Sequence, residues 1–271
     1  MTTSNETAAR EFRRLHQEGL LVLANAWDGA TARLIESLGG VAVATSSAAV
    51  AWAHGYPDGD ALPVRLLVAT VADIARVVRV PLSVDIEGGY SDDPATAGEV
   101  VAQVIDAGGV GINIEDADKD PDLLCRKIEA ARSASARLGV ELFVNAHTDV
   151  YLADLAPRER RVEETLARAA RYRAAGADGL FVPGVIDPGE IKTIASSVGL
   201  PLNVLARDGL PVASELESLG VRRLSAGSGI AQAAFGRIAS LATAFLSTGA
   251  SAPLAQELLP YAALNRLMTD R

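Results

Sequence analysis

The segment PLSVDIEGGY, residues 81–90, places two acidic residues directly after an apolar run. Asp85 and Glu87 are two positions apart, so both side chains can lie on the same face at the end of a strand. Gly88 and Gly89 follow them, and glycine allows the backbone to turn sharply at that point. Two buried carboxylates need a cation or protons to offset their charge. The segment therefore predicts an acid/base site or a metal site.

Polar side chains recur at the ends of three further apolar runs of the chain. They are Asn113 and Glu115 in 109–115, Asn145 and His147 in 141–147, and Asn203 with Arg207 in and just after 201–206. Carboxylates without adjacent thiols or histidine pairs favour a hard cation, Mg²⁺ or else Mn²⁺. The alternative is that the acids only cap helices or pair with surface arginines.

The histidines and the single cysteine lead to separate expectations. His147 is either a structural residue or a ligand contact, and its ordinary pKa suits proton transfer near neutrality. It is the first candidate for the acid or base, and Tyr90 is the second. His16 and His54 are expected to be surface or loop residues. Cys125 lies in a helical pattern, and a lone cysteine cannot form an internal disulfide.

Eight short β-rich runs alternate with segments of helical spacing, many of which end in glycine. The runs begin at residues 20, 41, 81, 109, 141, 179, 201 and 221. This alternation predicts one α/β domain over 1–271, a (β/α)₈ TIM barrel. An extra helix is expected at about 5–18, and C-terminal helices at 229–271 are expected in oligomer contacts. A doubly wound sheet is the alternative, but no G-x-G-x-x-G follows the first run.

Composition and charge exclude several classes of protein. The net charge is −9, and no cluster of Lys and Arg suggests a nucleic-acid surface. No apolar run approaches the roughly 18 residues of a membrane span, so no membrane segment is predicted. The polar N-terminal segment does not resemble a signal peptide. With one cysteine in the chain, a reducing cytoplasm is the expected location.

Four segments resemble the isocitrate lyase/phosphoenolpyruvate mutase superfamily, in its short-chain, phosphonomutase-like branch. They are NAWDGATARLIESLG, DIEGGY, GINIED and NAHTDVYL, and the similarity runs from about Asn25 to Gln232. The resemblance implies a (β/α)₈ barrel and a homotetramer or dimer whose last helix is often exchanged between subunits. It also implies Mg²⁺-dependent chemistry on small 2-oxo or 2-hydroxy carboxylic acids through an enolate.

The resemblance also implies roles for individual residues. Asp85, Glu87 and Glu115 match the acids of the metal site, and Asp58 in GYPDGD matches a further acid of that site. Ser46 lies in the turn that holds the substrate's carboxylate and oxyanion.

The chain also departs from the superfamily pattern at three positions. Ser47 and Ser91 stand where the superfamily usually has glycine, and His147 stands where it usually has a carboxylate-binding arginine. Neutral imidazole cannot replace the bidentate, permanently charged fork of arginine. The substrate must therefore differ, or another cation, Arg207 or Lys119, must bind its carboxylate.

These residues lead to a functional prediction with two alternatives. The main prediction is a lyase that makes or breaks a C–C bond beside a carboxylate-bearing carbon, through a metal-stabilised enolate. The residues expected to surround the substrate are Ser46, Ser47, Asn113, Asn145, His147, Asn203 and Arg207. The alternatives are P–C bond chemistry on a phosphonate, and a barrel that binds a keto acid without turnover. Neither the K-[KR]-C-G-H loop of the isocitrate lyases nor the E-D-K-x-F-P-K loop of the phosphonomutases is present.

Overall fold

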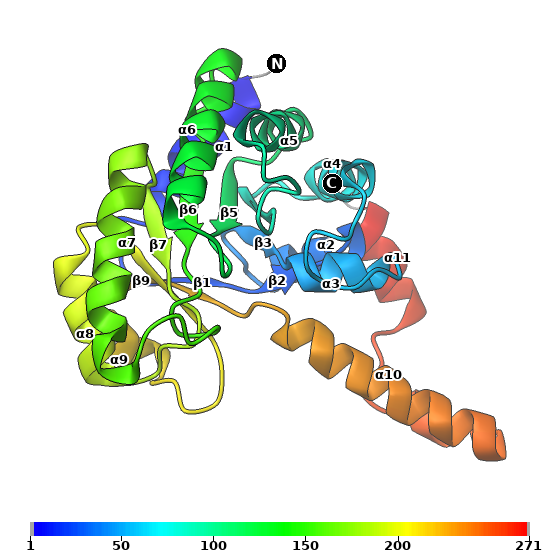
Figure 1. Cartoon of the computed structure of the whole chain (residues 1–271). Coiled ribbons are helices and arrows are strands. Elements are labelled where there is room, and N and C mark those ends of the chain that lie inside the picture. Colours follow the sequence, from blue (N-terminus) through cyan, green and yellow to red (C-terminus); the bar gives the residue numbers. More distant parts are fainter. Residues whose placement is uncertain (1–2, 270–271) are drawn as a thin grey trace.

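One sheet of short parallel strands forms the centre of the computed structural model, which describes residues 3–269 (Figure 1). Its nine strands follow the order β1-β9-β8-β7-β6-β5-β4-β3-β2. β1 (Leu21–Leu23) and β2 (Asn25–Ala26) are two parts of the first predicted run. β1 pairs with β9 and β2 pairs with β3, so this interrupted strand joins the two ends of the sheet. The predicted barrel of eight βα positions is confirmed.

The other seven predicted runs are also strands, and helices alternate with them. The strands are β3 (Val43–Thr45), β4 (Leu82–Asp85), β5 (Gly111–Glu115), β6 (Phe143–His147), β7 (Gly179–Phe181), β8 (Leu202–Leu205) and β9 (Val221–Ser225). The helices are α2 (Gly29–Ser37), α3 (Ser47–Ala53), α4 (Val64–Val77), α5 (Pro94–Asp106), α6 (Pro121–Leu138), η1 (Arg158–Arg160), α7 (Arg161–Ala175), α8 (Pro188–Ser197) and α9 (Ala213–Ser218). Because every pair is parallel, all carboxyl ends meet at one end of the barrel, here called the mouth.

Three of the helices begin with the same local signal, an aspartate followed by proline. Asp93, Asp120 and Asp187 cap α5, α6 and α8, and each side chain accepts a hydrogen bond from a backbone N–H of the first turn. Proline fits the next position because its missing N–H would have no partner within the helix. The sequence thus sets the start of each of these helices, and with it the length of the loop that leaves the mouth.

The additional helix α1 (Thr3–Leu15) closes the opposite end of the barrel. Phe12 is fully buried against the start of β5, where a Cβ at Gly111 would lie 2.6 Å from its ring. His16 is buried as well, and its ring stacks on Phe143 with a centroid distance of 3.9 Å. His16 lies in the turn after α1, so the expectation of a loop residue is met, but the expectation of a surface position is wrong. The helix itself was predicted, but not the face that it buries.

A buried carboxylate joins three elements beside the mouth. Asp116 follows β5, and its side chain is completely buried. One oxygen accepts from the Thr148 hydroxyl at 2.7 Å, from Arg168 Nη1 at 2.8 Å and from the Tyr172 hydroxyl at 2.5 Å. The other accepts from the backbone N–H of Asp149 at 2.9 Å. Asp116 thereby ties the end of β5 and the loop after β6 to α7.

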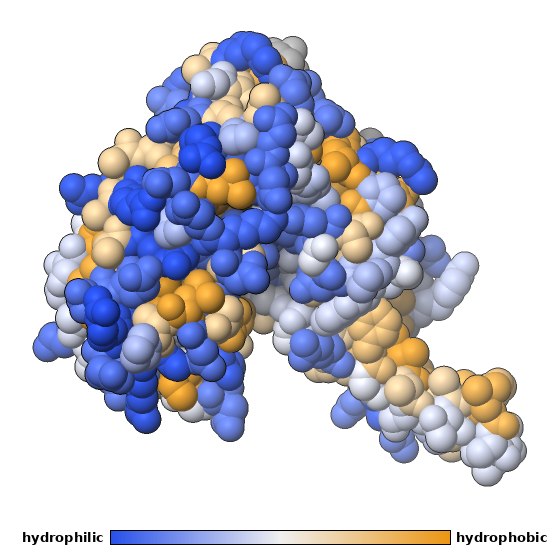
Figure 2. Space-filling view, viewed as in Figure 1, coloured by the Kyte–Doolittle hydropathy of each residue, from blue (hydrophilic) through white to orange (hydrophobic). Residues whose placement is uncertain are grey.

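The C-terminal region begins with α10 (Gly229–Thr248), which projects from the barrel, and continues with η2 (Ala252–Ala255) and α11 (Tyr261–Thr269) (Figure 1). Hydrophobic residues are exposed along α10 (Figure 2), and Leu246 is 84% exposed. Within residues 3–269, α10 is the one helix that could cross a membrane by length and composition alone, and 6% of its apolar window is buried. The earlier expectation that no apolar run approaches this length is wrong for α10.

The Asp116 network predicts a large loss of stability when its charge is removed. In Asp116→Asn, Arg168 loses one of its two carboxylate partners in a buried site, and the other is Glu164. We expect the free energy of unfolding to fall by about 3 kcal/mol. Urea unfolding would measure the loss. The matched control is Asp122→Asn, whose partner Arg171 is exposed, and it should change stability by less than about 1 kcal/mol. Equal losses in both variants would contradict the prediction.

Buried His16 predicts a specific pH dependence of stability. Burial lowers the pKa of His16 to about 3, whereas a histidine in an unfolded chain titrates near about 6.5. Between these values the unfolded chain binds a proton that the folded chain does not, so His16 reduces stability as the pH falls through this range. His16→Phe should therefore gain stability relative to the unmodified protein by up to about 1.4 kcal/mol for each pH unit.

Urea unfolding near neutrality and again about two pH units lower would measure this difference. His54→Phe is the control, because His54 is exposed and its ring contacts the Thr70 hydroxyl. The same pH-dependent gain in both variants would show that His16 is not its source.

Candidate active site

Asp85, the last residue of β4, is the most firmly held acid at the mouth. Its Oδ2 accepts from Ser47, from the hydroxyl at 3.0 Å and from the backbone N–H at 3.3 Å. Its Oδ1 accepts from the N–H of Glu87 at 3.4 Å. Burial and then nearby Glu115 raise the pKa of Asp85 to about 6, and His147 opposes both. Asp85 is held in one position, and a neighbouring positive charge stabilises its ionised form. Such a carboxylate is suited to bind a cation.

Glu87 lies in the turn after β4 rather than on the strand, and its backbone φ of 50° is in the left-handed region. Its carboxylate accepts from the Tyr90 hydroxyl at 3.2 Å and from the backbone N–H of Asp60. Burial raises the pKa of Glu87 to about 7, although the bond from Asp60 lowers it. Glu87 therefore organises the loop around Asp60 as well as adding charge to the mouth.

Asp60 is an acid that the sequence analysis did not single out. It lies in the same loop as the predicted metal residue Asp58, and its Oδ1 accepts from the N–H of Tyr90 at 3.0 Å. A Cβ at Gly88 would lie 2.9 Å from its Oδ2, so a larger residue there would displace the Asp60 carboxylate. Burial raises the pKa of Asp58 and of Asp60, and the charge of Glu115 raises both further. The GYPDGD segment carried the signal, since it holds two acids.

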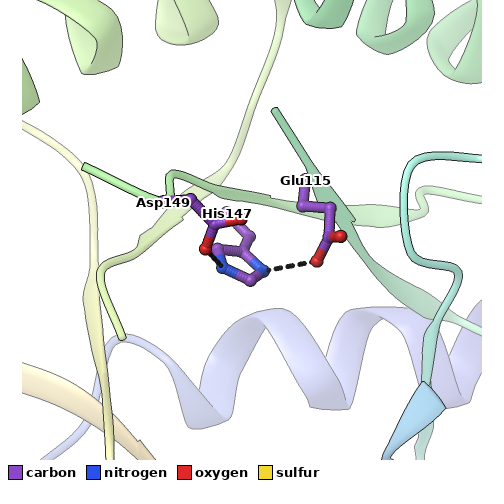
Figure 3. A group of neighbouring side chains, drawn as sticks. All are labelled: Glu115, His147 and Asp149. Atoms are coloured by element: carbon purple, nitrogen blue, oxygen red, sulfur yellow. Dashed lines mark hydrogen bonds and ion pairs between the residues drawn. The ribbon is translucent and has the colours of Figure 1, made fainter. Parts of the chain in front are cut away.

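His147, at the end of β6, contacts a carboxylate with each ring nitrogen (Figure 3). Nδ1 lies 3.1 Å from Oε2 of Glu115, and Nε2 lies 2.7 Å from Oδ1 of Asp149. Burial lowers the pKa of His147, but the hydrogen bonds to Asp149 and Glu115 outweigh it and hold the pKa well above its ordinary value. Among the described residues, these three side chains form a group that could hold a metal ion. Asp149 was not predicted, although NAHTD places it two residues after His147.

Three asparagines predicted to bind substrate meet inside the barrel. The side-chain amide of Asn145 donates to the Oδ1 atoms of Asn113 at 2.9 Å and Asn203 at 3.0 Å. Asn203 donates in turn to the Ser225 hydroxyl at 3.1 Å, which also accepts from Arg223 Nε at 3.1 Å. All five side chains are buried. They form a continuous polar network that orients the asparagines beneath the mouth.

Arg223 is the third residue that the sequence analysis missed. It is 1% exposed, and its Nη1 and Nη2 atoms have no hydrogen-bond partner within the described chain. Burial lowers the pKa of Arg223 to about 10, and Asp85 opposes this effect. The sequence carried a signal for its burial, since alternate residues of a strand lie on the same face. Val221, Arg223 and Ser225 share the buried face of β9.

The remaining predicted residues lie in different settings. Ser46 caps α3, and its hydroxyl accepts from the N–H of Ala49 at 3.4 Å. Arg207 is exposed in the loop after β8, and no ion pair involving it is found in the described chain. Lys119 pairs with the exposed Asp92. Lys127, which was not predicted, is buried and donates to the carbonyl of Gly88 at 2.6 Å.

A cavity of about 30 Å³ lies beside the acids, and Asp60, Glu115, Lys119 and Lys127 are among its lining residues. It thus brings two of the acids of the mouth next to two lysines. Two wider hollows of about 560 and 640 Å³ lie elsewhere, between α1 and the ends of neighbouring helices, and include none of these acids. We therefore assign the chemistry to the mouth because of the side chains gathered there, and not because of the volume of its cavity.

Comparison with known proteins agrees with this architecture. An uncharacterized protein of Mycobacterium tuberculosis (strain ATCC 25618 / H37Rv) is 38% identical over 264 residues, covering 96% of both chains. The oxaloacetate decarboxylase of Pseudomonas fluorescens (strain SBW25) is 32% identical and covers 83% of this chain and 80% of its own. The crystal structure of a proposed lyase/mutase from Burkholderia cenocepacia J2315 is 33% identical, with a TM-score of 0.90, covering 99% of this chain and 98% of that chain.

A family model supplies the last comparison. The model of the phosphoenolpyruvate phosphomutase family matches residues 12–246, which include every strand and all the acids of the mouth. The resemblance seen in the sequence is therefore confirmed over most of the chain. This protein belongs to the phosphoenolpyruvate phosphomutase family, within the isocitrate lyase/phosphoenolpyruvate mutase superfamily.

Proposed function

We propose that this protein is a metal-dependent lyase that makes or breaks a C–C bond in a small 2-oxo or 2-hydroxy carboxylic acid through an enolate. The observation that carries the proposal is the convergence of Asp85, Glu115 and His147 at the ends of three adjacent strands. The similarity to an oxaloacetate decarboxylase, at 32% identity, supports a 2-oxo acid as the substrate class.

The donor set fits a hard divalent cation, Mg²⁺ or Mn²⁺. Asp58, Asp85, Glu87 and Glu115 supply carboxylate oxygens, and each of the first three has a raised pKa because burial disfavours its charge. Positive charge among these acids would offset the burial cost. When bound, such an ion would polarise an oxygen of the substrate and favour the enolate.

The side chains of the mouth have distinct parts in this reaction. His147 can hold a proton at Nδ1, next to Glu115, and is the proposed acid or base. Tyr90 is the weaker candidate, because burial raises the pKa of its hydroxyl and keeps it a donor to Glu87. Ser46, Ser47 and the buried asparagines would position the substrate. Arg207 is the first candidate to bind its carboxylate, and Lys119 is the second because it already pairs with Asp92.

Cleavage of a P–C bond is the second candidate. A phosphonate carries more negative charge than a carboxylate, and Lys119 and Lys127 both line the cavity beside Glu115. Lys127 already donates to Gly88, however, and Lys119 already pairs with Asp92. Because both lysines already have partners, they are less able to bind a phosphonate, and C–C chemistry is the better-supported proposal.

Proton NMR in D₂O, with Mg²⁺ and a panel of 2-oxo and 2-hydroxy acids, tests the lyase proposal. We expect metal-dependent deuterium exchange at C3 or a new pyruvate-like signal. Glu115→Gln should reduce the rate by about 100-fold or more, because a charge that stabilises the reacting oxygen through the metal is lost. The control is Glu99→Gln, whose side chain is exposed on α5 and pairs with Arg137.

Each result of that experiment has a definite meaning. Phosphonate turnover without any C3 chemistry would replace the lyase with the second candidate. Metal binding without exchange or product from any compound would favour a barrel that binds keto acids without turnover. Equal rates in Glu115→Gln and Glu99→Gln would remove Glu115 from the reaction.

We also propose that a second copy of this chain covers the exposed face of α10, in a dimer or tetramer. Phe235 lies against Trp52 at a centroid distance of 6.4 Å, whereas Ile238, Phe245 and Leu246 are 58%, 48% and 84% exposed. Such a row of apolar side chains on a projecting helix favours association.

Light scattering should give at least twice the monomer mass of 28.1 kDa. Leu246→Glu together with Phe245→Glu should shift the mass toward the monomer, because charged side chains oppose burial of this face. The control Ser240→Glu lies on the same helix outside the apolar set. A monomeric unmodified protein, or one that sediments with lipid vesicles instead, would contradict the proposal.

A further inference from the structure

The two nitrogens of His147 are not equivalent, and their difference assigns them separate roles. Nε2 lies 2.7 Å from Oδ1 of Asp149, while Nδ1 on the other side of the ring lies 3.1 Å from Oε2 of Glu115 (Figure 3). The shorter contact is a normal hydrogen bond from a ring N–H to a carboxylate. Nδ1, which makes the longer contact, faces the acids of the mouth. One of these acids is Asp85, whose pKa is raised by Glu115 and lowered by His147.

Asp149 is held in place from outside the site. Its backbone N–H donates to Asp116 at 2.9 Å, and the neighbouring Thr148 hydroxyl donates to the same carboxylate at 2.7 Å. Arg168 and Tyr172 complete the partners of Asp116. Asp149 is therefore a fixed acceptor for the proton on Nε2, so Nδ1 is the nitrogen that can exchange its proton for a cation.

The distance between Nδ1 and Glu115 suits two ligands of one ion. Transition-metal bonds to imidazole nitrogen and carboxylate oxygen are about 2.1 Å long, so adjacent ligands at right angles lie about 3.0 Å apart. The observed separation is 3.1 Å. A histidine ligand whose other nitrogen donates to a carboxylate is a common arrangement at protein metal sites, because the carboxylate fixes the ring and its tautomer.

We propose that His147 is itself a metal ligand through Nδ1, beside Glu115, and that Asp149 orients the ring through Nε2 without binding the ion. A site with one imidazole among carboxylates prefers first-row transition ions such as Mn²⁺, Co²⁺ or Zn²⁺ to Mg²⁺. The inference deepens the proposed function and rests on it only in placing a divalent cation at the mouth. It replaces the acid or base role proposed for His147, because a nitrogen bound to a metal ion carries no proton.

Electron spin-echo spectroscopy of the full chain loaded with Mn²⁺ tests the assignment without any substrate. We expect modulation from a directly bound ¹⁴N nucleus in the unmodified protein and its loss in His147→Gln. His54→Gln is the matched control and should keep the signal, since His54 contacts Thr70 away from these acids. Asp149→Asn should keep the nitrogen signal but bind Mn²⁺ about 10- to 100-fold more weakly, because the ring loses its orienting partner.

Calorimetric titration with Mn²⁺ and Mg²⁺ supplies the second measurement. His147→Gln should weaken Mn²⁺ binding by about 10-fold or more and Mg²⁺ binding by less, because Mg²⁺ prefers oxygen ligands. Circular dichroism of each variant would establish that it is folded, and Asp149→Asn provides an independent reading if His147→Gln does not fold.

The outcomes separate this inference from the proposed lyase activity. Mn²⁺ bound without nitrogen modulation, or bound equally well by His147→Gln, would overturn the ligand role of His147. No binding of Mn²⁺ to the unmodified protein would overturn it as well. Nitrogen modulation in a protein that turns over no acid would support the metal ligand and reject the lyase.

Discussion

The geometry of the mouth depends on one buried charge, the carboxylate of Asp116. It accepts hydrogen bonds from Thr148, Arg168, Tyr172 and the backbone of Asp149, so both of its oxygens are used. Removing a charge of this kind would leave its buried partners unpaired, which is more costly than losing a surface ion pair. The loop that holds Asp149 therefore stays in one position, and the ring of His147 follows it. The loop with Asp149 and the ring of His147 thus form the fixed side of the site, and the other acids of the mouth are positioned relative to it.

The mouth gathers more negative charge than an inert barrel would tolerate. Asp58, Asp60, Asp85 and Glu87 all have raised pKa values, with burial as the first cause in each case. The protein holds this charge with backbone donors, with the hydroxyls of Ser47 and Tyr90, and with a turn in which Glu87 has a positive φ. Backbone strain of this type persists only where the surrounding structure fixes it, and it is concentrated at functional sites. Energy stored at the mouth is consistent with a site built for a cation.

Much of the site was predictable because a parallel barrel converts sequence position into spatial position. The carboxyl ends of all strands meet at one end, so acids that end different strands must be neighbours. Asp85, Glu115 and His147 followed from that rule alone, and the eight strand positions followed from alternating patterns. Asp60 and Lys127 did not, because a loop and a long side chain reach the mouth from outside the strands. The burial of His16 was missed for a related reason, since its contact with Phe143 joins residues distant in the chain.

The sequence by itself determined the order of the elements, the starts of the helices at Asp-Pro pairs, and which residue types stand at the strand ends. These depend on short-range rules, namely capping, the period of strands and helices, and glycine at tight turns. Only the tertiary structure decided that Asp149 and Glu115 contact opposite nitrogens of His147, and that Asp116 fixes this arrangement. Side-chain direction at such a site depends on packing from several elements at once, and no local pattern in the chain encodes that combination.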